Sequence, residues 1–250
     1  MRIEENFTAA ILAGGLGTRL RPVLNDRPKV MAEVNDRPFI TYLLDQVAAA
    51  GVKRAILCTG YKAERIAAFL GEEYRGMQIL YSQEPSPLGT AGALRLALPK
   101  MENETVLVMN GDSYLETDLR NFWNRHRAKG ATNSLLLTKV SDTGRYGRVE
   151  TDCNGRILRF VEKGRDGGPG WINAGLYLLS RQLLQSIPDQ GEVSLEREVL
   201  PNCVDKNFFG FESRGRFLDI GIPESYQEAQ SLFQHISDIP AICGYKVSQL

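Results

Sequence analysis

Histidine is scarce in this chain of 250 residues, in which His126 and His235 are the only two. Neither lies in a pattern typical of a catalytic base or of a metal-ligand set, so chemistry built on several histidines is disfavoured. The four cysteines are dispersed and no C-x-x-C motif occurs, so the sequence supports neither a zinc site nor a disulfide framework. We therefore expect reduced thiols.

The sequence also lacks long apolar runs and an excess of charge of one sign. No apolar stretch approaches the ~20 residues that span a bilayer, and the first ten residues lack the basic and apolar regions of a signal peptide. Thirty basic and 30 acidic residues cancel, which disfavours binding to nucleic acid or to an anionic membrane through bulk charge. We expect a cytoplasmic protein that binds neither, although a small phosphorylated ligand needs only a few local charges.

Short apolar runs alternate with helix-like stretches in the first half of the chain. The pattern predicts strands over 8–12, 52–59, 78–81 and 105–109, and helices over 38–50, 62–70 and 90–98. Such alternation is typical of right-handed βαβ units around a parallel sheet, whose ligands bind at the carboxyl ends of the strands. In the second half we predict strands over 133–140, 148–151, 157–162, 171–179 and 207–212, and helices near 181–186, 195–200 and 224–234.

The strongest local motif, LAGGLGTRLRP over residues 12–22, directly follows the first predicted strand. Its glycines allow the backbone to approach a ligand closely, and its free N–H groups can surround phosphate oxygens. Thr18, Arg19 and Arg21 add a hydroxyl and two cationic groups suited to phosphate. The alternative is a plain turn with surface arginines. No Gly-Lys pair of a P-loop occurs, and Leu20 stands where a dinucleotide-binding motif has its third glycine.

Other small or polar residues lie where a nucleotide would bind. Lys29 follows Pro28, which fixes the chain so that the ammonium group can point back at the glycine loop. Residues 88–92 form a second small-residue loop that opens a helix, and Gln83 and Glu84 just before it could read the edge of a base. A solvated lysine and an ordinary helix start are the alternatives.

Two aspartates follow apolar runs at the rim where such sheets bind ligands. Asp112 ends the run VLVMNGD, and Asp219 follows Phe217 and Leu218. Mg²⁺ prefers one or two carboxylates completed by waters and substrate phosphates, so this pair could hold one such ion. Each aspartate could instead be a turn or helix-cap residue. Asn and Gly at 173–175 are poor strand formers, which indicates either a ligand contact or a bulge.

The motifs form an ordered set that resembles the sugar-nucleotidyltransferase family from about residue 8 to residue 233. In chain order the set reads LAGGLGTRLRP, RPKVM, GYK, PLGTAGAL, NGD, RYG, EK, NAG and DIGIPESY. Within the family, the stretches NDRPFITYLLDQ, CTGYKAERI, SLEREVLP and RFLDIGIPESYQEAQ look most like D-glycero-α-D-manno-heptose 1-phosphate guanylyltransferases.

The resemblance implies a Rossmann-like, three-layer αβα fold with a mixed, mostly parallel central sheet. It implies one domain over residues 1–234, with a nucleotide-binding N-terminal half and a sugar-binding C-terminal half. Residues 235–250 follow as either a loose tail or a dimer contact, so a homodimer stays open.

The resemblance also assigns roles to individual residues. It implies nucleotide binding by Leu12, Ala13, Gly14, Gly15, Gly17, Thr18, Gln83, Gly89 and Thr90. It implies catalytic contacts to phosphate by Arg19, Lys29 and Lys163. It implies binding of the sugar phosphate by Gly147, Glu162, Lys163, Asn173 and Gly175. It implies that Mg²⁺ binds Asp112 and Asp219.

In the family's reaction an oxygen of a sugar 1-phosphate attacks the α-phosphorus of a nucleoside triphosphate, and pyrophosphate leaves. That phosphate is already ionised, so no general base is needed, in agreement with the shortage of histidine. We expect GTP and a heptose 1-phosphate as substrates, giving a GDP-heptose for surface polysaccharide. Mannose 1-phosphate with GTP, or glucose 1-phosphate with UTP, CTP or dTTP, are alternatives of the same class. A catalytically silent module that senses nucleotide sugars is the alternative of another class.

Overall fold

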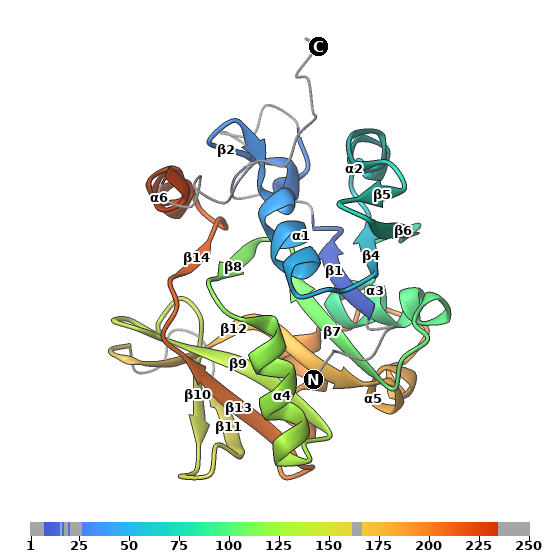
Figure 1. Ribbon diagram of the computed structural model, residues 1–250. Helices are drawn as coiled ribbons and strands as arrows, with labels where there is room; N and C mark the ends of the chain where they lie inside the picture. The colour runs from blue at the N-terminus through green and yellow to red at the C-terminus, as the bar shows by residue number, and fades with distance from the viewer. Residues whose placement is uncertain (1–7, 16, 18–19, 21–26, 162–166, 235–250) are drawn as a thin grey trace.

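The computed structural model describes residues 8–15, 17, 20, 27–161 and 167–234. Its centre is an eight-stranded sheet with the strand order β13-β9-β12-β7-β1-β4-β6-β5 (Figure 1). The strands of this sheet are β1 (Thr8–Ala13), β4 (Arg54–Thr59), β5 (Glu73–Tyr74), β6 (Met77–Gln83), β7 (Thr105–Asn110), β9 (Asn133–Val140), β12 (Gly170–Ser180) and β13 (Phe208–Ser213).

The sheet is mixed but mostly parallel. Strands β6, β4, β1 and β7 pair in parallel, as do β9 and β13. Strand β12 runs antiparallel to both of its neighbours, β7 and β9, and the short β5 runs antiparallel to β6. The predicted sheet type is therefore confirmed.

Helices cover both faces of the sheet. The helices are α1 (Phe39–Ala49), α2 (Ala63–Leu70), α3 (Gly89–Ala97), α4 (Leu119–Lys129), α5 (Arg181–Ser186) and α6 (Pro223–Gln234), with a π-helical turn over Leu195–Val199. Side chains of α1, α2, α4 and α6 share one core with Ile11 and Met109 of the sheet. Side chains of α3, α5 and the π-helical turn share a second core with Ala10 and Val108, on the opposite face. Since neighbouring residues of one strand point to opposite faces, the two cores make three layers, as predicted.

Three small two-stranded sheets complete the described chain. They pair β2 (Glu33–Val34) with β3 (Arg37–Pro38), β8 (Ser113–Leu115) with β14 (Phe217–Asp219), and β10 (Arg148–Thr151) with β11 (Ile157–Val161). Short 3-10 turns cover Lys29–Met31, Leu98–Lys100 and Pro201–Cys203. The β8–β14 pair matters most for function, because it lies directly after β7 and joins the two halves of the chain.

Most predicted elements form at the expected places, but α4 was not predicted. This helix, LRNFWNRHRAK, has few apolar residues, and its polar face hides the helical period. Its ends nevertheless carry clear signals. The Asp118 carboxylate accepts hydrogen bonds from the N–H groups of Arg120 and Asn121, and Gly130 ends the helix in the left-handed conformation.

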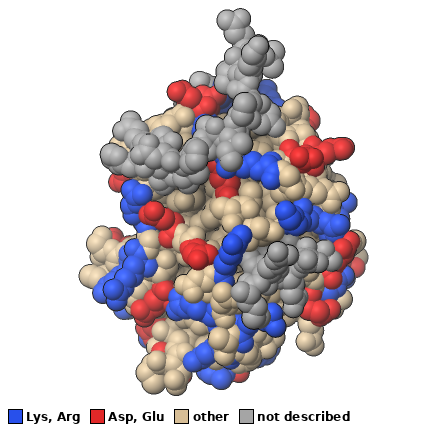
Figure 2. Space-filling model, viewed as in Figure 1, with Lys and Arg blue, Asp and Glu red and all other residues tan. Residues whose placement is uncertain are grey.

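The chain has 30 basic and 30 acidic residues. Figure 2 shows basic and acidic side chains interspersed over the face drawn in Figure 1. Among the described helices, none is both long and apolar enough to cross a membrane. Residues 235–250, the predicted tail, lie outside the described residues.

Candidate functional site

A cleft of about 750 Å³ opens at the carboxyl ends of β1, β6 and β7. Ten residues assigned to the site from sequence line it: Leu12, Ala13, Gly14, Gly15, Gly17, Lys29, Gln83, Gly89, Thr90 and Asp112. They come from four separate segments of the chain, which the parallel strands bring to one edge of the sheet. This edge is where ligands of open α/β sheets bind.

Glu84 is fixed against the glycine loop at one end of the cleft. An added Cβ on Gly14 would lie 2.6 Å from Oε1 of Glu84, and one on Gly60 would lie 2.5 Å from the same atom. Oε2 of Glu84 accepts a hydrogen bond from the N–H group of Leu88 at 3.0 Å. Burial raises the pKa of Glu84 above its ordinary value. A side chain at either glycine would displace the Glu84 carboxylate from this position.

Gln83 and Glu84 were both predicted as groups that could read a base edge, and only Gln83 entered the predicted nucleotide-binding set. The structure distinguishes them. Gln83 ends β6 with an exposed side chain, whereas Glu84 is half-buried and held by Leu88. Both line the cleft. Nucleotide binding by Gln83 stays a prediction, and Glu84 is the more buried of the two groups.

Asp112 and Asp219 lie close together because β8 and β14 pair. Asp112 immediately precedes β8, and Asp219, the last residue of β14, stands across from Ser113 in the antiparallel register. The N–H group of Ile220 also donates to the carbonyl oxygen of Asp112 at 2.9 Å. The two carboxylates therefore converge although they are far apart in the sequence.

The ammonium group of Lys29 lies between these two carboxylates. Lys29 begins a 3-10 turn after Pro28, and only 11% of its side chain is exposed. Its Nζ lies 2.6 Å from Oδ2 of Asp112 and 4.0 Å from Oδ1 of Asp219. Burial, together with the negative charge of Asp112, raises the pKa of Asp219. A cation next to Asp219 opposes both effects, so this corner of the cleft favours positive charge.

The donor set fits a small divalent cation only in part. Within the described ranges, no group of three or more histidine, cysteine or acidic side chains could hold a metal by itself. Asp112 and Asp219 supply two hard oxygen ligands near one point. Two carboxylates suit Mg²⁺, which takes its other ligands from water and phosphate.

A partly buried hydrogen-bond chain connects the strand β12 with the start of α3. Asn173 donates from Nδ2 to the Tyr177 hydroxyl at 2.8 Å, and that hydroxyl donates to Oε1 of Glu196 at 3.4 Å. The hydroxyl of Thr90 donates to Oε2 of Glu196 at 2.8 Å and accepts from the N–H group of Leu195. Burial and the nearby Glu196 charge raise the pKa of Tyr177 well above its ordinary value. The phenol therefore stays neutral and acts as a fixed link.

Tyr177 and Glu196 were not assigned to the site from sequence. The chain that they form joins Asn173, predicted to bind the sugar, to Thr90, predicted to bind the base. Tyr177 looked like an ordinary core residue of an apolar strand. Glu196 was noted only inside the stretch SLEREVLP. A fully buried tyrosine hydroxyl needs a partner, and that requirement is the signal that could have found the pair.

The other residues of the predicted sugar side are only partly described. Gly175 packs against the side chains of Ser113 and Asn110, beside the end of β7. Gly147 closes a turn through a hydrogen bond from its N–H group to Thr143, and it does not line the cleft. Thr18, Arg19, Glu162 and Lys163 lie outside the described residues. Arg145 was missed by sequence reasoning, although its guanidinium lies 4.0 Å from Oδ2 of Asp219.

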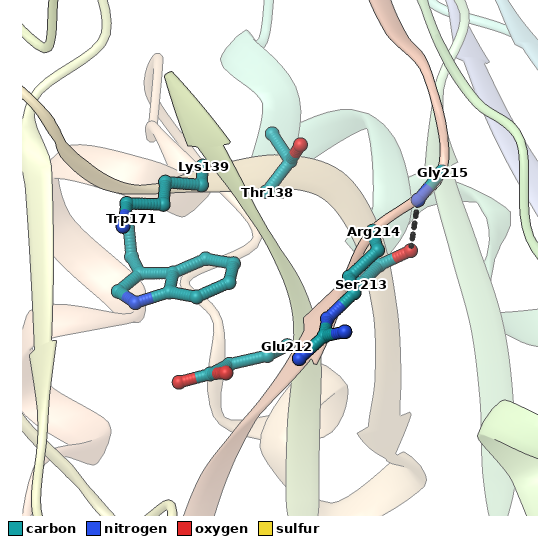
Figure 3. A pocket seen from close by; sticks show the side chains of 7 residues that line it. All are labelled: Thr138, Lys139, Trp171, Glu212, Ser213, Arg214 and Gly215. Atoms are coloured by element: carbon teal, nitrogen blue, oxygen red, sulfur yellow. Dashed lines mark hydrogen bonds between the residues drawn. The ribbon is translucent and has the colours of Figure 1, made fainter. Parts of the chain in front are cut away.

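A second hollow, of about 360 Å³, lies at the ends of β9 and β13 and the start of β12. Figure 3 shows the indole of Trp171 on one side of it and the side chains of Glu212 and Arg214 on the facing strand. None of the residues assigned to the site from sequence lines this hollow. Ten of the fourteen predicted site residues that the structure describes line the larger cleft instead.

The chain is similar in sequence to known proteins along most of its length. The chain is 39% identical to a D-glycero-alpha-D-manno-heptose 1-phosphate guanylyltransferase of Aneurinibacillus thermoaerophilus, over 91% of this chain and 98% of that protein. It is 38% identical to a mannose-1-phosphate guanylyltransferase of Mycobacterium tuberculosis, over 97% of this chain and 69% of that protein.

The fold is also similar to that of a solved structure. HddC from Yersinia pseudotuberculosis, in a crystal structure complexed with GMP-PN, matches with a TM-score of 0.79 at 35% sequence identity. The match covers 91% of this chain and 99% of that chain. The nucleotidyl transferase family model matches residues 8–235, a range that contains every strand of the central sheet. The resemblance drawn from the ordered motifs is confirmed, and the chain belongs to the nucleotidyl transferase family.

Proposed function

We propose that this protein is a sugar-1-phosphate guanylyltransferase whose preferred acceptor is D-glycero-α-D-manno-heptose 1-phosphate. The observation that carries the proposal is the meeting of Lys29, Asp112 and Asp219 at the mouth of a glycine-lined cleft. This corner places one cation and two metal-ligating oxygens beside backbone N–H groups that suit phosphate. Two mutually repelling anionic substrates need such a site to align them.

The reaction follows from these groups. Backbone N–H groups of the glycine loop bind the triphosphate, and Lys29 neutralises charge that develops at the reacting phosphate. Asp112 and Asp219 would hold Mg²⁺, which neutralises phosphate charge when bound. The attacking oxygen belongs to a phosphate that is ionised at neutral pH, so no side chain needs to remove a proton. Catalysis then rests on alignment and on charge neutralisation.

Glu84 supports guanine as the base. Guanine presents two adjacent N–H donors, N1–H and the N2 amino group, on its pairing edge. A carboxylate accepts both, whereas adenine presents an acceptor at N1 that a carboxylate repels. The burial of Glu84 between Gly14 and Gly60 fixes the acceptor oxygens at one end of the cleft. GTP is therefore favoured over ATP.

Heptose is favoured over mannose by the similarity to the D-glycero-alpha-D-manno-heptose 1-phosphate guanylyltransferase, which matches along 98% of its length. The mannose-1-phosphate guanylyltransferase relative extends beyond the matched region, and only 69% of it is covered. The two sugars differ by one carbon at the end remote from the phosphate. Mannose 1-phosphate is therefore the first alternative acceptor.

A grid of nucleotides and sugar 1-phosphates tests the proposal. GTP with the heptose 1-phosphate and Mg²⁺ should release pyrophosphate with the highest kcat/KM, and omission of Mg²⁺ should abolish release. A higher kcat/KM with mannose 1-phosphate than with the heptose 1-phosphate would identify mannose 1-phosphate as the preferred acceptor. A higher kcat/KM with UTP, CTP or dTTP than with GTP would identify that nucleotide as the preferred donor. GTP binding without pyrophosphate release from any pair would favour a sensing module.

Two further expectations belong to this proposal. The GDP-heptose would be made in the cytoplasm, where nucleoside triphosphates are available, and would supply surface polysaccharide synthesis. A homodimer is proposed as the assembly. Sedimentation of the purified chain at several concentrations tests the assembly, and a single monomeric species at all concentrations would exclude it.

A further inference from the structure

We propose that Arg145 binds the phosphate of the sugar 1-phosphate, and that Asp219 holds its guanidinium until a divalent cation displaces it. The proposal rests on the proposed function for the identity of the phosphate. It gives a role to Arg145, the first residue of the RYG motif, and it adds a second role for Asp219. Asp219 interacts with the guanidinium of Arg145 before it binds the metal.

Asp219 faces a different cation with each of its carboxylate oxygens. Oδ1 lies 4.0 Å from Nζ of Lys29, and Oδ2 lies 4.0 Å from a guanidinium nitrogen of Arg145. The Asp219 side chain is 22% exposed, whereas that of Arg145 is 46% exposed. A mostly buried carboxylate is therefore bracketed by two cations, one of which reaches in from solvent.

The two cations reach Asp219 from different parts of the site. Lys29 packs beside the glycine loop, since a Cβ on Gly17 would lie 3.1 Å from the Cβ of Lys29. Arg145 belongs to the turn that ends at Gly147, one of the residues predicted to bind the sugar. Lys29 is thus placed for the nucleotide phosphates, and Arg145 is placed for the phosphate of the other substrate.

The turn that carries Arg145 is anchored next to Asp219. The guanidinium lies 5.2 Å from the centre of the Tyr146 ring, and that ring packs edge-on against Phe217 at 5.8 Å. Phe217 begins β14, the strand that ends at Asp219. The N–H groups of Tyr146 and Gly147 also donate to the carbonyl oxygen of Thr143. The backbone is held while the long arginine side chain keeps its freedom to change partners.

Metal binding changes the charge balance at Asp219. A divalent cation on Asp112 and Asp219 neutralises both carboxylates, so the attraction of Asp219 for the guanidinium falls. A phosphate dianion offers Arg145 a better partner, because the planar guanidinium donates two parallel hydrogen bonds to phosphate oxygens. The metal thereby frees the arginine for the substrate at the point where the substrate arrives.

Arg145→Gln tests the exchange through two measurements that should change in opposite directions. Mn²⁺ binding to the substrate-free protein, followed by the electron paramagnetic resonance of free Mn²⁺, should tighten about two- to fivefold, because a competing cation is gone. The KM for the sugar 1-phosphate should rise about tenfold or more, because a charged hydrogen bond is lost. The KM for the nucleoside triphosphate should stay within about twofold of its wild-type value.

Two further variants complete the experiment. Arg159→Gln removes an exposed arginine that pairs with Glu150 on the β10–β11 hairpin, and it should leave both quantities unchanged. Arg145→Lys keeps the charge and should recover part of the affinity for the sugar phosphate. Mn²⁺ affinity that is unchanged or weaker in Arg145→Gln overturns the exchange, and an unchanged KM for the sugar phosphate overturns the phosphate contact.

Failure of the proposed function would look different. If the wild-type protein releases pyrophosphate from no substrate pair, calorimetric binding of mannose 1-phosphate in the presence of Mn²⁺ replaces the KM. A tenfold or greater loss of this binding in Arg145→Gln still supports the contact, and equal binding overturns it. The Mn²⁺ measurement on the free protein is independent of turnover.

Discussion

Nζ of Lys29 lies 2.6 Å from Oδ2 of Asp112, whereas its distance to Oδ1 of Asp219 is 4.0 Å. The ammonium group is thus bonded to the more accessible of the two carboxylates, the one whose side chain is 42% exposed. Lys29, Asp112 and Asp219 are charged groups of this corner that interact with one another. Neutralising any one of them should impair the reaction more than it impairs folding.

Asp112→Asn should lower turnover by about 10²–10³-fold, because the site loses one of the two carboxylates proposed to hold Mg²⁺ beside the reacting phosphate. The free energy of unfolding should change less, since the Asp112 side chain is 42% exposed and an asparagine oxygen can still accept from Lys29. Pyrophosphate release and thermal unfolding measure the two effects. Glu102→Gln, which removes the exposed partner of Arg54, is the control and should change neither. Near-normal Mg²⁺-dependent rates in Asp112→Asn would remove this residue from the metal site.

Glu84→Gln should reduce the preference for GTP over ATP by about 10- to 100-fold, because one oxygen that accepts from guanine becomes an amide donor. The remaining amide oxygen can still accept from the N–H group of Leu88, so the loop should keep its shape. The ratio of kcat/KM values for the two nucleotides measures the effect. Gln83→Ala, at the exposed neighbouring position, should change the ratio less. A larger change of this ratio in Gln83→Ala than in Glu84→Gln would show that Gln83, the residue predicted from sequence, makes the contact to the base.

Tyr177→Phe should destabilise the protein by about 1–3 kcal/mol, because Asn173 and Glu196 each lose a buried hydrogen-bond partner. The KM for the sugar 1-phosphate should rise as well, because Asn173 loses one of the two side-chain hydrogen bonds that orient it. Urea unfolding and steady-state kinetics measure the two effects. Tyr81→Phe is the matched control, since its hydroxyl donates to Gly71 at the surface. If unfolding changes equally in both variants, the buried chain contributes nothing of its own.

Gly89→Ala should destabilise the protein by about 2–5 kcal/mol, because strain from a left-handed residue adds to a steric clash. The φ angle of Gly89 is +73°, and an added Cβ would lie 2.4 Å from the carbonyl oxygen of Val193. Gly76 has the same φ of +73° with nothing within 4 Å of an added Cβ, so Gly76→Ala should cost about 1–2 kcal/mol. The difference in unfolding free energy isolates the clash. Equal costs would mean that the loop over residues 88–92 moves freely away from Val193.

The stability of the protein should fall as the pH is lowered through the range from 6.5 to 4, in part because of His126. Burial lowers the pKa of His126 to about 4, so the unfolded chain binds a proton in this range and the folded chain does not. The contribution is about 3 kcal/mol over the whole range and is fully lost below it. His126→Gln should flatten the dependence, measured by urea unfolding at several pH values. If the free energy of unfolding of His126→Gln depends on pH as steeply as that of the wild type, groups other than His126 cause the loss of stability at low pH.

Much of the fold was predictable because the strands and most helices carry strong local periods. The alternation of strand and helix up to residue 110 fixes the parallel half of the sheet, and the structure follows it closely. The helix α4 was not predicted, because buried apolar residues such as Phe122 and Trp123 are few among its charged residues. Its capping residue, Asp118, was a better signal than its hydropathy.

Residues of the candidate site could be predicted from sequence where the residue type and its local pattern indicate a chemical role. The glycine loop and the two aspartates after apolar strands were found in this way, and the structure brings them to one rim. Tyr177 could not be found by that route, because a buried tyrosine in an apolar strand has the pattern of a core residue. Arg145 depends on a distance across the fold, and its interaction with Asp219 has no signature in the sequence.

The pairing of β8 with β14 has a consequence for how the protein is made. It joins segments separated by roughly a hundred residues, and contacts of such long sequence separation form slowly because a large loop must close first. The strands β1, β4, β6 and β7 precede β14 in synthesis, so the nucleotide side of the cleft is translated well before Asp219. A nascent or truncated chain that ends before β14 carries Lys29 and Asp112 without their third partner. Only a chain that extends through β14 therefore brings Asp219 to Lys29 and Asp112.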